Sequence, residues 1–369
     1  MSIITLNKCY SAAITEDTLK KSKYYDLSKL YINNCLICDT TKENIIIDLI
    51  NNSEKEVILT GCINKSITNR LKNNPKVIQI LPYQDVYGLV AKVYHDDFQC
   101  DAIIVRPQEG CTGTCTYCNI TDKKNLSHPV DTLVDAISNT MDDTVKAISI
   151  VGAHEISNYN HEGKDLIDLI NIIYDKFNLP MSAICIQPKY FIKEHIRFQE
   201  LIKSKKLLFL RISAQSGSHK VLRDMNRDFE FEKLNDIIKE IKSHTTSVKL
   251  ATEMIYGFPT ESFDDIKMSI ALANLFDITA WHSYKQLIGS VMSVVSPDVD
   301  REKGESYRPI IEQYGKQLGI NVIMLAYNNT YNSYITEQGK QLGLNVTIRT
   351  ENKKIDINKL NNKYWFFTK

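Results

Sequence analysis

Between Asp101 and about Ser293, strand-like and helix-like segments alternate along the sequence. Apolar runs that predict buried strands lie at residues 102–105, 147–151, 181–186, 207–212, 248–255 and 278–287. Stretches that predict amphipathic helices lie between them, at residues 129–141, 164–176, 231–242 and 262–275. This repeated alternation predicts an α/β fold with a parallel sheet and outer helices, either an open sheet or a partial (β/α)6 barrel. In such folds the loops after the strands carry the chemistry, so a site is expected at that edge of the sheet.

Three cysteines directly follow the first predicted strand. Cys111, Cys115 and Cys118 have the spacing C-x3-C-x2-C. A [4Fe–4S] cluster is usually held by four Cys thiolates, so three of them leave one iron open. With this spacing the open iron normally binds S-adenosylmethionine (SAM), which the reduced cluster can cleave to a 5′-deoxyadenosyl radical. The alternative is three core cysteines that fall close together, but the flanking Gly110 and Tyr117 favour a cluster loop.

A second set of cysteines lies in a smaller N-terminal α/β unit. Strand-like runs at residues 3–6, 30–32 and 57–59 lead into Cys9, Cys35 and Cys62, respectively. Parallel strands in register would bring these cysteines to one edge of a sheet, which is the arrangement that a second cluster with a free iron needs. Taken singly, each cysteine is more simply a core thiol, but together they predict a second cluster.

Composition sets the class of protein. The chain has 369 residues, of which 43% are hydrophobic, enough for two domains with their own cores. Nine cysteines argue against a secreted disulfide framework. No stretch approaches the roughly 20 apolar residues that span a bilayer, and the first residues do not resemble a signal peptide, so we expect a cytoplasmic protein. The net charge of +1 excludes a global attraction to nucleic acid but not a local basic patch.

These patterns divide the chain into three parts. We expect an N-terminal domain at residues 1–95, a barrel domain at residues 96–295 and a small α/β region at residues 296–369. In the last part, residues 315–322 and 339–346 are similar to each other. Each copy predicts a helix end, a glycine cap and a strand start.

With both cysteine sets placed, the chain resembles the methylthiotransferase family of radical SAM enzymes over roughly residues 1–295. The cluster loop is most similar to the archaeal and eukaryotic branch, which acts on threonylcarbamoyladenosine in tRNA. The segments that carry the resemblance are residues 7–9, 32–35, 59–62, 109–118, 215–218, 225–227 and 253–261.

The resemblance implies two [4Fe–4S] clusters with different roles. The cluster on Cys111, Cys115 and Cys118 would bind and cleave SAM, so that hydrogen is abstracted from an unactivated C–H bond. The cluster on the three N-terminal cysteines would carry the sulfur, and a second SAM would supply the methyl group. The resemblance also implies a reducing partner such as a flavodoxin or a ferredoxin, and no membrane.

Further matched positions predict contacts to SAM. The predicted cofactor-binding residues are Tyr117, Gly152, Glu155, Ser213, Gln215, Gly217 and Gly257. Glu155 could accept from the ammonium group of SAM or be a solvated loop acid, and Tyr117 could pack beside the cofactor or only fill space. Arg227 could form a structural ion pair or touch a ligand.

Departures from the family bear on the substrate. The family's C-terminal RNA-binding β-barrel is not recognisable, the Arg-Gly pair after the cluster loop is missing from residues 119–124, and residues 284–290 lack the family's Arg and prolines. Cys38 is an extra thiol near Cys35. These departures favour a peptide or protein side chain as the substrate. The alternative is the N6-modified adenosine beside the anticodon of tRNA, which would need a basic face, with Lys203, Lys205, Lys206 and the lysines of the C-terminal region as candidates. An inactive protein with a purely structural cluster is disfavoured because all six cluster cysteines are present.

Overall fold

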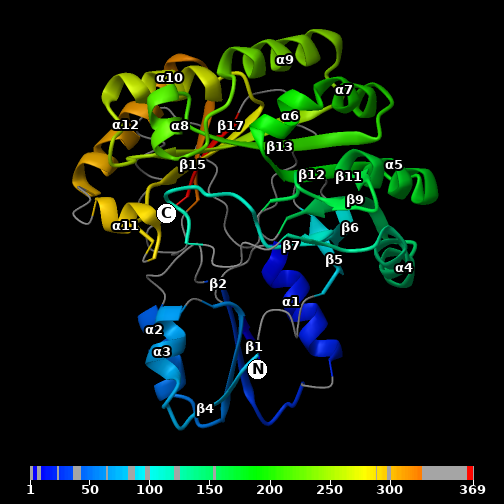
Figure 1. Ribbon diagram of the computed structural model, residues 1–369, viewed down its shortest axis with the longest axis vertical. Coiled ribbons are helices and arrows are strands. Elements are labelled where there is room, and N and C mark those ends of the chain that lie inside the picture. Colours follow the sequence, from blue (N-terminus) through cyan, green and yellow to red (C-terminus); the bar gives the residue numbers. More distant parts are fainter. Residues whose placement is uncertain are drawn as a thin grey trace.

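The computed structural model describes residues 3–5, 10–22, 25–35, 43–63, 65–81, 88–95, 100–119, 125–152, 155–287, 289–296, 301–325 and 364–368. In Figure 1 a large helix-covered unit lies above a smaller N-terminal unit. None of the helices in the described ranges is long and apolar enough to cross a membrane.

A nine-stranded sheet forms the large unit, in the order β16-β17-β15-β14-β13-β12-β9-β6-β5. Six parallel strands in chain order make up its centre. They are β6 (Cys100–Val105), β9 (Val145–Val151), β12 (Met181–Ile186), β13 (Leu207–Gln215), β14 (Lys249–Tyr256) and β15 (Ile278–Ser283). These strands confirm the predicted α/β class with a partial (β/α)6 barrel.

Helices cover the outer face of this sheet. The four predicted helices are confirmed as α4 (Val130–Thr140), α5 (Leu166–Phe177), α9 (Phe231–His244) and α10 (Phe263–Ala273). Asp165 and Ser262 start α5 and α10 with capping boxes, in which side chains satisfy the first free amides of the helix. The shorter helices α6 (Pro188–Lys193), α7 (His195–Lys203) and α8 (His219–Asp224) were not predicted, because segments of nine residues or fewer give little periodic signal.

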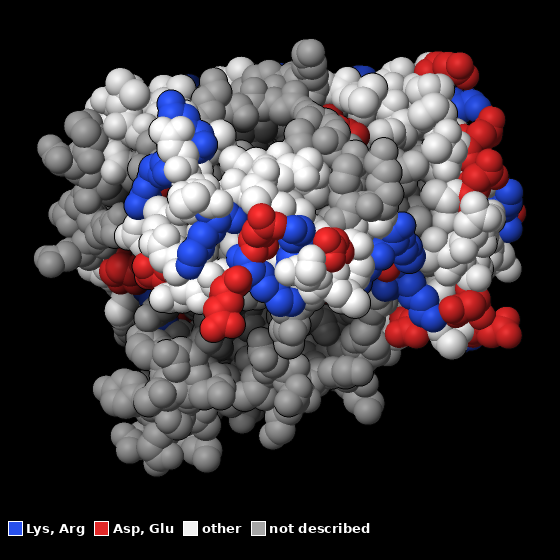
Figure 2. Space-filling view, turned by 90° about the horizontal axis from the view of Figure 1, so that it is seen from below, with Lys and Arg blue, Asp and Glu red and all other residues white. Residues whose placement is uncertain are grey.

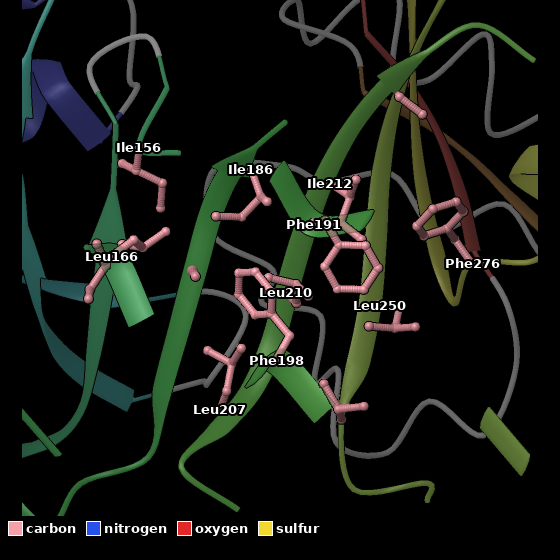
Figure 3. Close-up of a cluster of buried hydrophobic side chains, with 14 of the residues drawn as sticks. Ile156, Leu166, Ile186, Phe191, Phe198, Leu207, Leu210, Ile212, Leu250 and Phe276 are labelled. Carbon is pink, nitrogen blue, oxygen red and sulfur yellow. The ribbon is translucent and has the colours of Figure 1, made fainter. Parts of the chain in front are cut away.

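The outer-face core is a single cluster of buried hydrophobic side chains. Figure 3 shows Phe191 of α6 and Phe198 of α7 beside Leu210 of β13, and all three side chains are fully buried. Burying an aliphatic or aromatic side chain of this size stabilises the fold by about 1.5–3 kcal/mol. This packing fixes the strands, and therefore also the loops at their ends.

The inner face of the sheet begins with an apolar layer. This layer consists of Ile104, Val151, Ile184, Phe209, Ala251 and Ile278, with Ile14 of α1 (Tyr10–Lys21) packed against it. Leu19 of the same helix belongs to the core of the N-terminal unit. Helix α1 therefore joins the two units, between which it lies in Figure 1.

Strands from outside the six repeats extend the sheet at both ends. β5 (Val90–His95) pairs antiparallel with β6, while β17 (Tyr364–Thr368) and β16 (Asn321–Leu325) continue it beyond β15. The described part of the C-terminal region thus adds to the large sheet, together with α11 (Val291–Val295) and α12 (Arg301–Gln317). The first similar segment has the predicted form, since Gly319 has a φ of +69° between α12 and β16. The second copy lies outside the described residues, as does the rest of the segment between residues 326 and 363.

The N-terminal unit has its own four-stranded parallel sheet in chain order. Its strands are β1 (Ile3–Thr5), β2 (Leu30–Cys35), β3 (Val57–Cys62) and β4 (Val77–Ile80), and α2 (Glu43–Asn51) and α3 (Lys65–Leu71) complete it. Two short antiparallel pairs occur in the loops of the large unit: β7 (Gln108–Glu109) with β8 (Leu126–Ser127), and β10 (Asn160–His161) with β11 (Lys164–Asp165).

Candidate functional site

The three cysteines of the predicted cluster loop follow β6 and β7, at the carboxyl-terminal edge of the sheet. Cys111 is buried, Cys115 and Cys118 are partly buried, and none of the three is part of a disulfide. The amide of Gly113 donates to Cys111 Sγ over 3.2 Å. A Cβ added at Gly113 would lie 3.1 Å from Cys111 Sγ and 3.9 Å from Cys115 Sγ, so both sulfurs flank this glycine.

The turn at Met225 and Asn226 holds this loop in place. The amide of Thr116 donates to the Met225 carbonyl over 3.1 Å, and its hydroxyl donates to the Asp224 carbonyl over 2.7 Å. Asn226 Nδ2 donates to Thr114 Oγ1 over 2.6 Å. These contacts give a structural reason for the motif at residues 225–227, which lies more than a hundred residues further along the chain.

The partly buried guanidinium of Arg227 lies against a cluster-loop thiol. Its Nη1 donates to Cys115 Sγ over 3.4 Å, and its Nη2 donates to the Ser213 carbonyl over 2.7 Å. Burial alone would lower the pKa of Arg227, but Tyr117 and Cys115 raise it overall, so the side chain stays charged. Among the described residues it pairs with no carboxylate, and a contact of Arg227 with a ligand stays a prediction.

The donor set fits a cluster held by thiolates. Burial raises the pKa of Cys111, whereas the Gly113 amide opposes this shift, and iron binding would have to displace the thiol protons. No three His, Cys, Asp or Glu side chains in the described ranges converge on a single ion. A [4Fe–4S] cubane does not require its ligands to converge on one ion, because each thiolate binds a different iron.

Tyr117 packs into an apolar group beside the loop. Its neighbours include Phe258, Tyr284 and Met292. Burial raises the pKa of Tyr117, so the phenol is neutral. This packing accounts for the aromatic residue, and a contact of Tyr117 with the cofactor stays a prediction.

Gly152 and Glu155 form the end of the second barrel strand. A Cβ at Gly152 would lie 2.6 Å from the carbonyl carbon of Glu155, so only glycine fits. The Glu155 carboxylate is 4% exposed and accepts from the Ser157 amide over 2.9 Å. Burial raises its pKa, and its charge in turn helps to raise the pKa of Cys111. The solvated loop acid considered from the sequence is therefore wrong for Glu155.

The later strand ends carry the other predicted cofactor residues. Ser213 Oγ donates to Glu253 Oε2 over 3.2 Å, and Gln215 has a φ of +71° at a bulge in β13. Gly257 has a φ of +77°, and its Cβ would lie 2.6 Å from Gly304 Cα. Gly217 differs from these, because its Cβ would lie 2.3 Å from the carbonyl oxygen of residue 268 in α10. Packing against α10 thus explains Gly217, and its role toward the cofactor stays a prediction.

Strand pairing brings two of the three N-terminal cysteines together. Cys35 and Cys62 are direct register partners at the carboxyl ends of β2 and β3. Cys9 and Cys38 lie outside the described residues. Two of the three cysteines predicted to hold the second cluster therefore lie at one edge of the small sheet.

The inner face of the barrel carries charged residues that the sequence analysis did not single out. Arg211 Nη1 lies 3.7 Å from Glu253 Oε1, and each of these side chains is 24% exposed. Burial lowers the pKa of the nearby His282, Glu253 opposes this shift, and Arg211 and Lys285 add to it. Arg211 and Glu253 each lie two residues after a residue of the inner apolar layer, Phe209 in β13 and Ala251 in β14. This spacing marks them as inner-face residues only when it is known which face of the sheet is the inner one.

The lysines proposed for RNA binding lie away from this edge. Lys203, Lys205 and Lys206 precede β13 and are therefore at its amino-terminal end. Lys206 pairs with Asp175 over 2.8 Å. Figure 2 shows one face of the molecule, on which basic and acidic side chains are interspersed. The three lysines thus lie at the opposite edge of the sheet from the cluster loop, and their role in RNA binding stays a prediction.

Comparisons with known proteins agree with this site. Residues 105–273 match the radical SAM superfamily. The chain is 23% identical over 348 residues to the tRNA-2-methylthio-N(6)-dimethylallyladenosine synthase of Pelagibacter ubique, covering 80% of this chain and 77% of that protein. It is 21% identical over 358 residues to the threonylcarbamoyladenosine tRNA methylthiotransferase MtaB of Thermotoga maritima, covering 84% and 80%.

The name of a third relative refers to a ribosomal protein rather than to tRNA. The ribosomal protein uS12 methylthiotransferase RimO of a Sulfurihydrogenibium species is 24% identical over 266 residues, covering 64% of this chain and 60% of that protein. Solved structures of radical SAM enzymes also align with this chain, but their TM-scores, such as 0.42 and 0.44, are too low to support a conclusion.

Proposed function

Because the chain belongs to the radical SAM methylthiotransferase family, we propose that it transfers a methylthio group to an N6-modified adenosine of tRNA. Relatives named as tRNA-modifying enzymes support this substrate, which was the alternative in the sequence analysis, better than the peptide preferred there. The cytoplasm, where tRNA is found, is the expected location.

The placement of Arg227 carries the proposal for the SAM site. This cation lies on Cys115 Sγ at the edge of the sheet where Glu155 is buried. Cys111, Cys115 and Cys118 would hold a [4Fe–4S] cluster, which supplies the electron that cleaves SAM. Arg227 would bind the carboxylate of SAM, and Glu155 would accept from its ammonium group. Because Gly152 has no Cβ, the backbone of Glu155 lies close against it, and this contact positions Glu155.

The register of the N-terminal sheet supports a second cluster. Cys35 and Cys62 are paired, and we propose that Cys9 joins them as the third ligand. This second cluster supplies the sulfur when bound. The reaction also needs a reducing partner, and a flavodoxin or ferredoxin has the right chemistry.

Two measurements test this function. Anaerobically reconstituted protein should contain about eight irons per chain, as two cubanes require, and about four would mean that one site is absent. Mass spectrometry of tRNA nucleosides from cells with and without the gene should show loss of one 2-methylthio nucleoside in the deletion strain. An unchanged nucleoside profile, with a methylthio group missing from a protein digest instead, would refute the tRNA substrate and support the peptide.

A further inference from the structure

Two elements of the barrel hold Arg227 against the cluster loop. Its backbone amide donates to the Leu222 carbonyl over 2.8 Å, which closes the turn after α8. Its Nη2 donates to the Ser213 carbonyl over 2.7 Å at the end of β13. Leu222 is fully buried in the outer-face core, so the core anchors this turn. Arg227 Nη1 is thereby placed 3.4 Å from Cys115 Sγ.

The residues on both sides of Cys115 are tied to the same turn. Thr114 Oγ1 accepts from Asn226 Nδ2 over 2.6 Å, and the amide of Thr116 donates to the Met225 carbonyl over 3.1 Å. Residues 114–116 and 225–227 therefore lie side by side. The contact between the guanidinium and the sulfur is thus built by the protein alone and does not depend on a bound ligand.

The charge of Arg227 acts mainly on the cluster loop. A guanidinium does not lose its proton in proteins, and Arg227 forms no salt bridge with a carboxylate in the described ranges. Cys115 and Cys111 are electrostatic neighbours of this charge. The Nε atom of Arg227 is buried and has no hydrogen-bond partner. The side chain therefore brings a positive charge and a hydrogen bond to a thiol that is predicted to bind iron.

Reduction changes the charge that Arg227 faces. One electron from the reducing partner would make a cluster and its three thiolates more negative by one unit, and no bond has to form or break in this step. A nearby cation stabilises the more negative state by Coulomb attraction. A hydrogen bond donated to a ligand sulfur acts in the same direction, and such hydrogen bonds help to set the potentials of iron–sulfur clusters. Both effects raise the reduction potential.

We propose that Arg227 raises the reduction potential of a [4Fe–4S] cluster on Cys111, Cys115 and Cys118, so that the reducing partner can deliver its electron. This inference rests on the proposed function, because it needs that cluster. Arg227 acts through Cys115 Sγ and is therefore a positioning residue in this role. The role is separate from the predicted contact with the carboxylate of SAM, because the hydrogen bond to the sulfur exists without SAM.

The test is an anaerobic redox titration of the reconstituted holoenzyme, followed by electron paramagnetic resonance and carried out without tRNA. The signal of the cluster on the loop is identified in parallel samples as the one that changes when saturating SAM is added. Arg227→Gln should lower the equilibrium constant for reduction of this cluster at least about ten-fold, as expected for a lost charged hydrogen bond. For one electron this is a decrease of about 59 mV in the potential, and it should be present without SAM.

Two further variants separate the charge from the fold. Arg227→Lys keeps the positive charge, so its potential should lie closer to that of the wild type than to that of Arg227→Gln. Arg223→Gln is the matched control, because it removes the same charge from an exposed position of α8, four residues earlier in the chain. Its potential should equal that of the wild type, since water and salt screen an exposed charge.

The outcomes distinguish the inference from the proposed function. An unchanged potential in Arg227→Gln would overturn the inference and leave the function intact. Equal decreases in Arg227→Gln and Arg227→Lys would show a merely structural role for Arg227 and would also overturn the inference. A wild-type protein without any signal that responds to SAM would overturn the proposed function itself. An unchanged tRNA nucleoside profile would overturn only the substrate, because the potentials are measured without tRNA.

Discussion

The buried carboxyl of Glu261 should make the stability of this protein depend on pH. Glu261 is 1% exposed, and its Oε2 accepts from the Gly257 amide over 2.6 Å, whereas its Oε1 has no hydrogen-bond partner. Burial raises the pKa of this group from its usual 4.5 to about 8. The neutral acid therefore holds the loop after β14, which contains Gly257, a predicted contact of SAM.

The sign and size of the effect follow from this shift. Because the folded-state pKa lies above the unfolded value, protonation favours the folded state. The stabilisation is complete below pH 4.5 and is lost as the pH rises toward 8. Each pH unit in this window changes the free energy of unfolding by about 1.4 kcal/mol. Glu261→Gln keeps an acceptor for the Gly257 amide but does not titrate. As the pH rises from 5.5 to 8, its free energy of unfolding should therefore increase by about 3 kcal/mol relative to that of the wild type.

Urea denaturation of both proteins across this pH range measures the difference. Asp264→Asn is the matched control, because Asp264 is 81% exposed at the start of α10 and pairs only with Lys267. The difference in free energy of unfolding between Asp264→Asn and the wild type should stay nearly constant with pH. A constant difference for Glu261→Gln as well would refute the reasoning, since Glu261 would then ionise in the folded protein as it does in the unfolded chain.

Three further predictions concern the site. Gly217→Ala should destabilise the protein by about 1–3 kcal/mol, measured by thermal unfolding, because its Cβ would lie 2.3 Å from a carbonyl oxygen of α10; an unchanged melting temperature would contradict the packing. Arg227→Gln should raise the KM for SAM at least about ten-fold, as expected for a lost charged hydrogen bond, with Arg227→Lys less affected; equal KM values would remove the carboxylate role. Cys62→Ala should reduce the iron content to about four per chain. Burial raises the pKa of the Cys185 thiol to about 12, and Cys185→Ala should keep the full iron content. Full iron content in Cys62→Ala would exclude Cys62 as a ligand.

Local sequence signals predicted most of the scaffold. The six central strands and the four longer helices were predicted because each is long enough to show its period of burial. The cysteine loop was predicted because its ligands lie within eight residues of one another. Helices α6, α7 and α8 were missed because each has little periodicity to read.

Contacts between distant segments were decided only by the tertiary structure. Arg227 meets Cys115 across 112 positions of the chain, and no local pattern distinguishes it from a surface arginine. The burial of Glu155 and the Arg211–Glu253 pair likewise depend on which strand faces are covered. The sequence by itself therefore determined the six central strands, the four helices predicted between them and the chemistry expected of the cysteine loop, because these signals are local. Packing decided which single charged residues face that chemistry, because only the assembled sheet gives each strand an inner and an outer side.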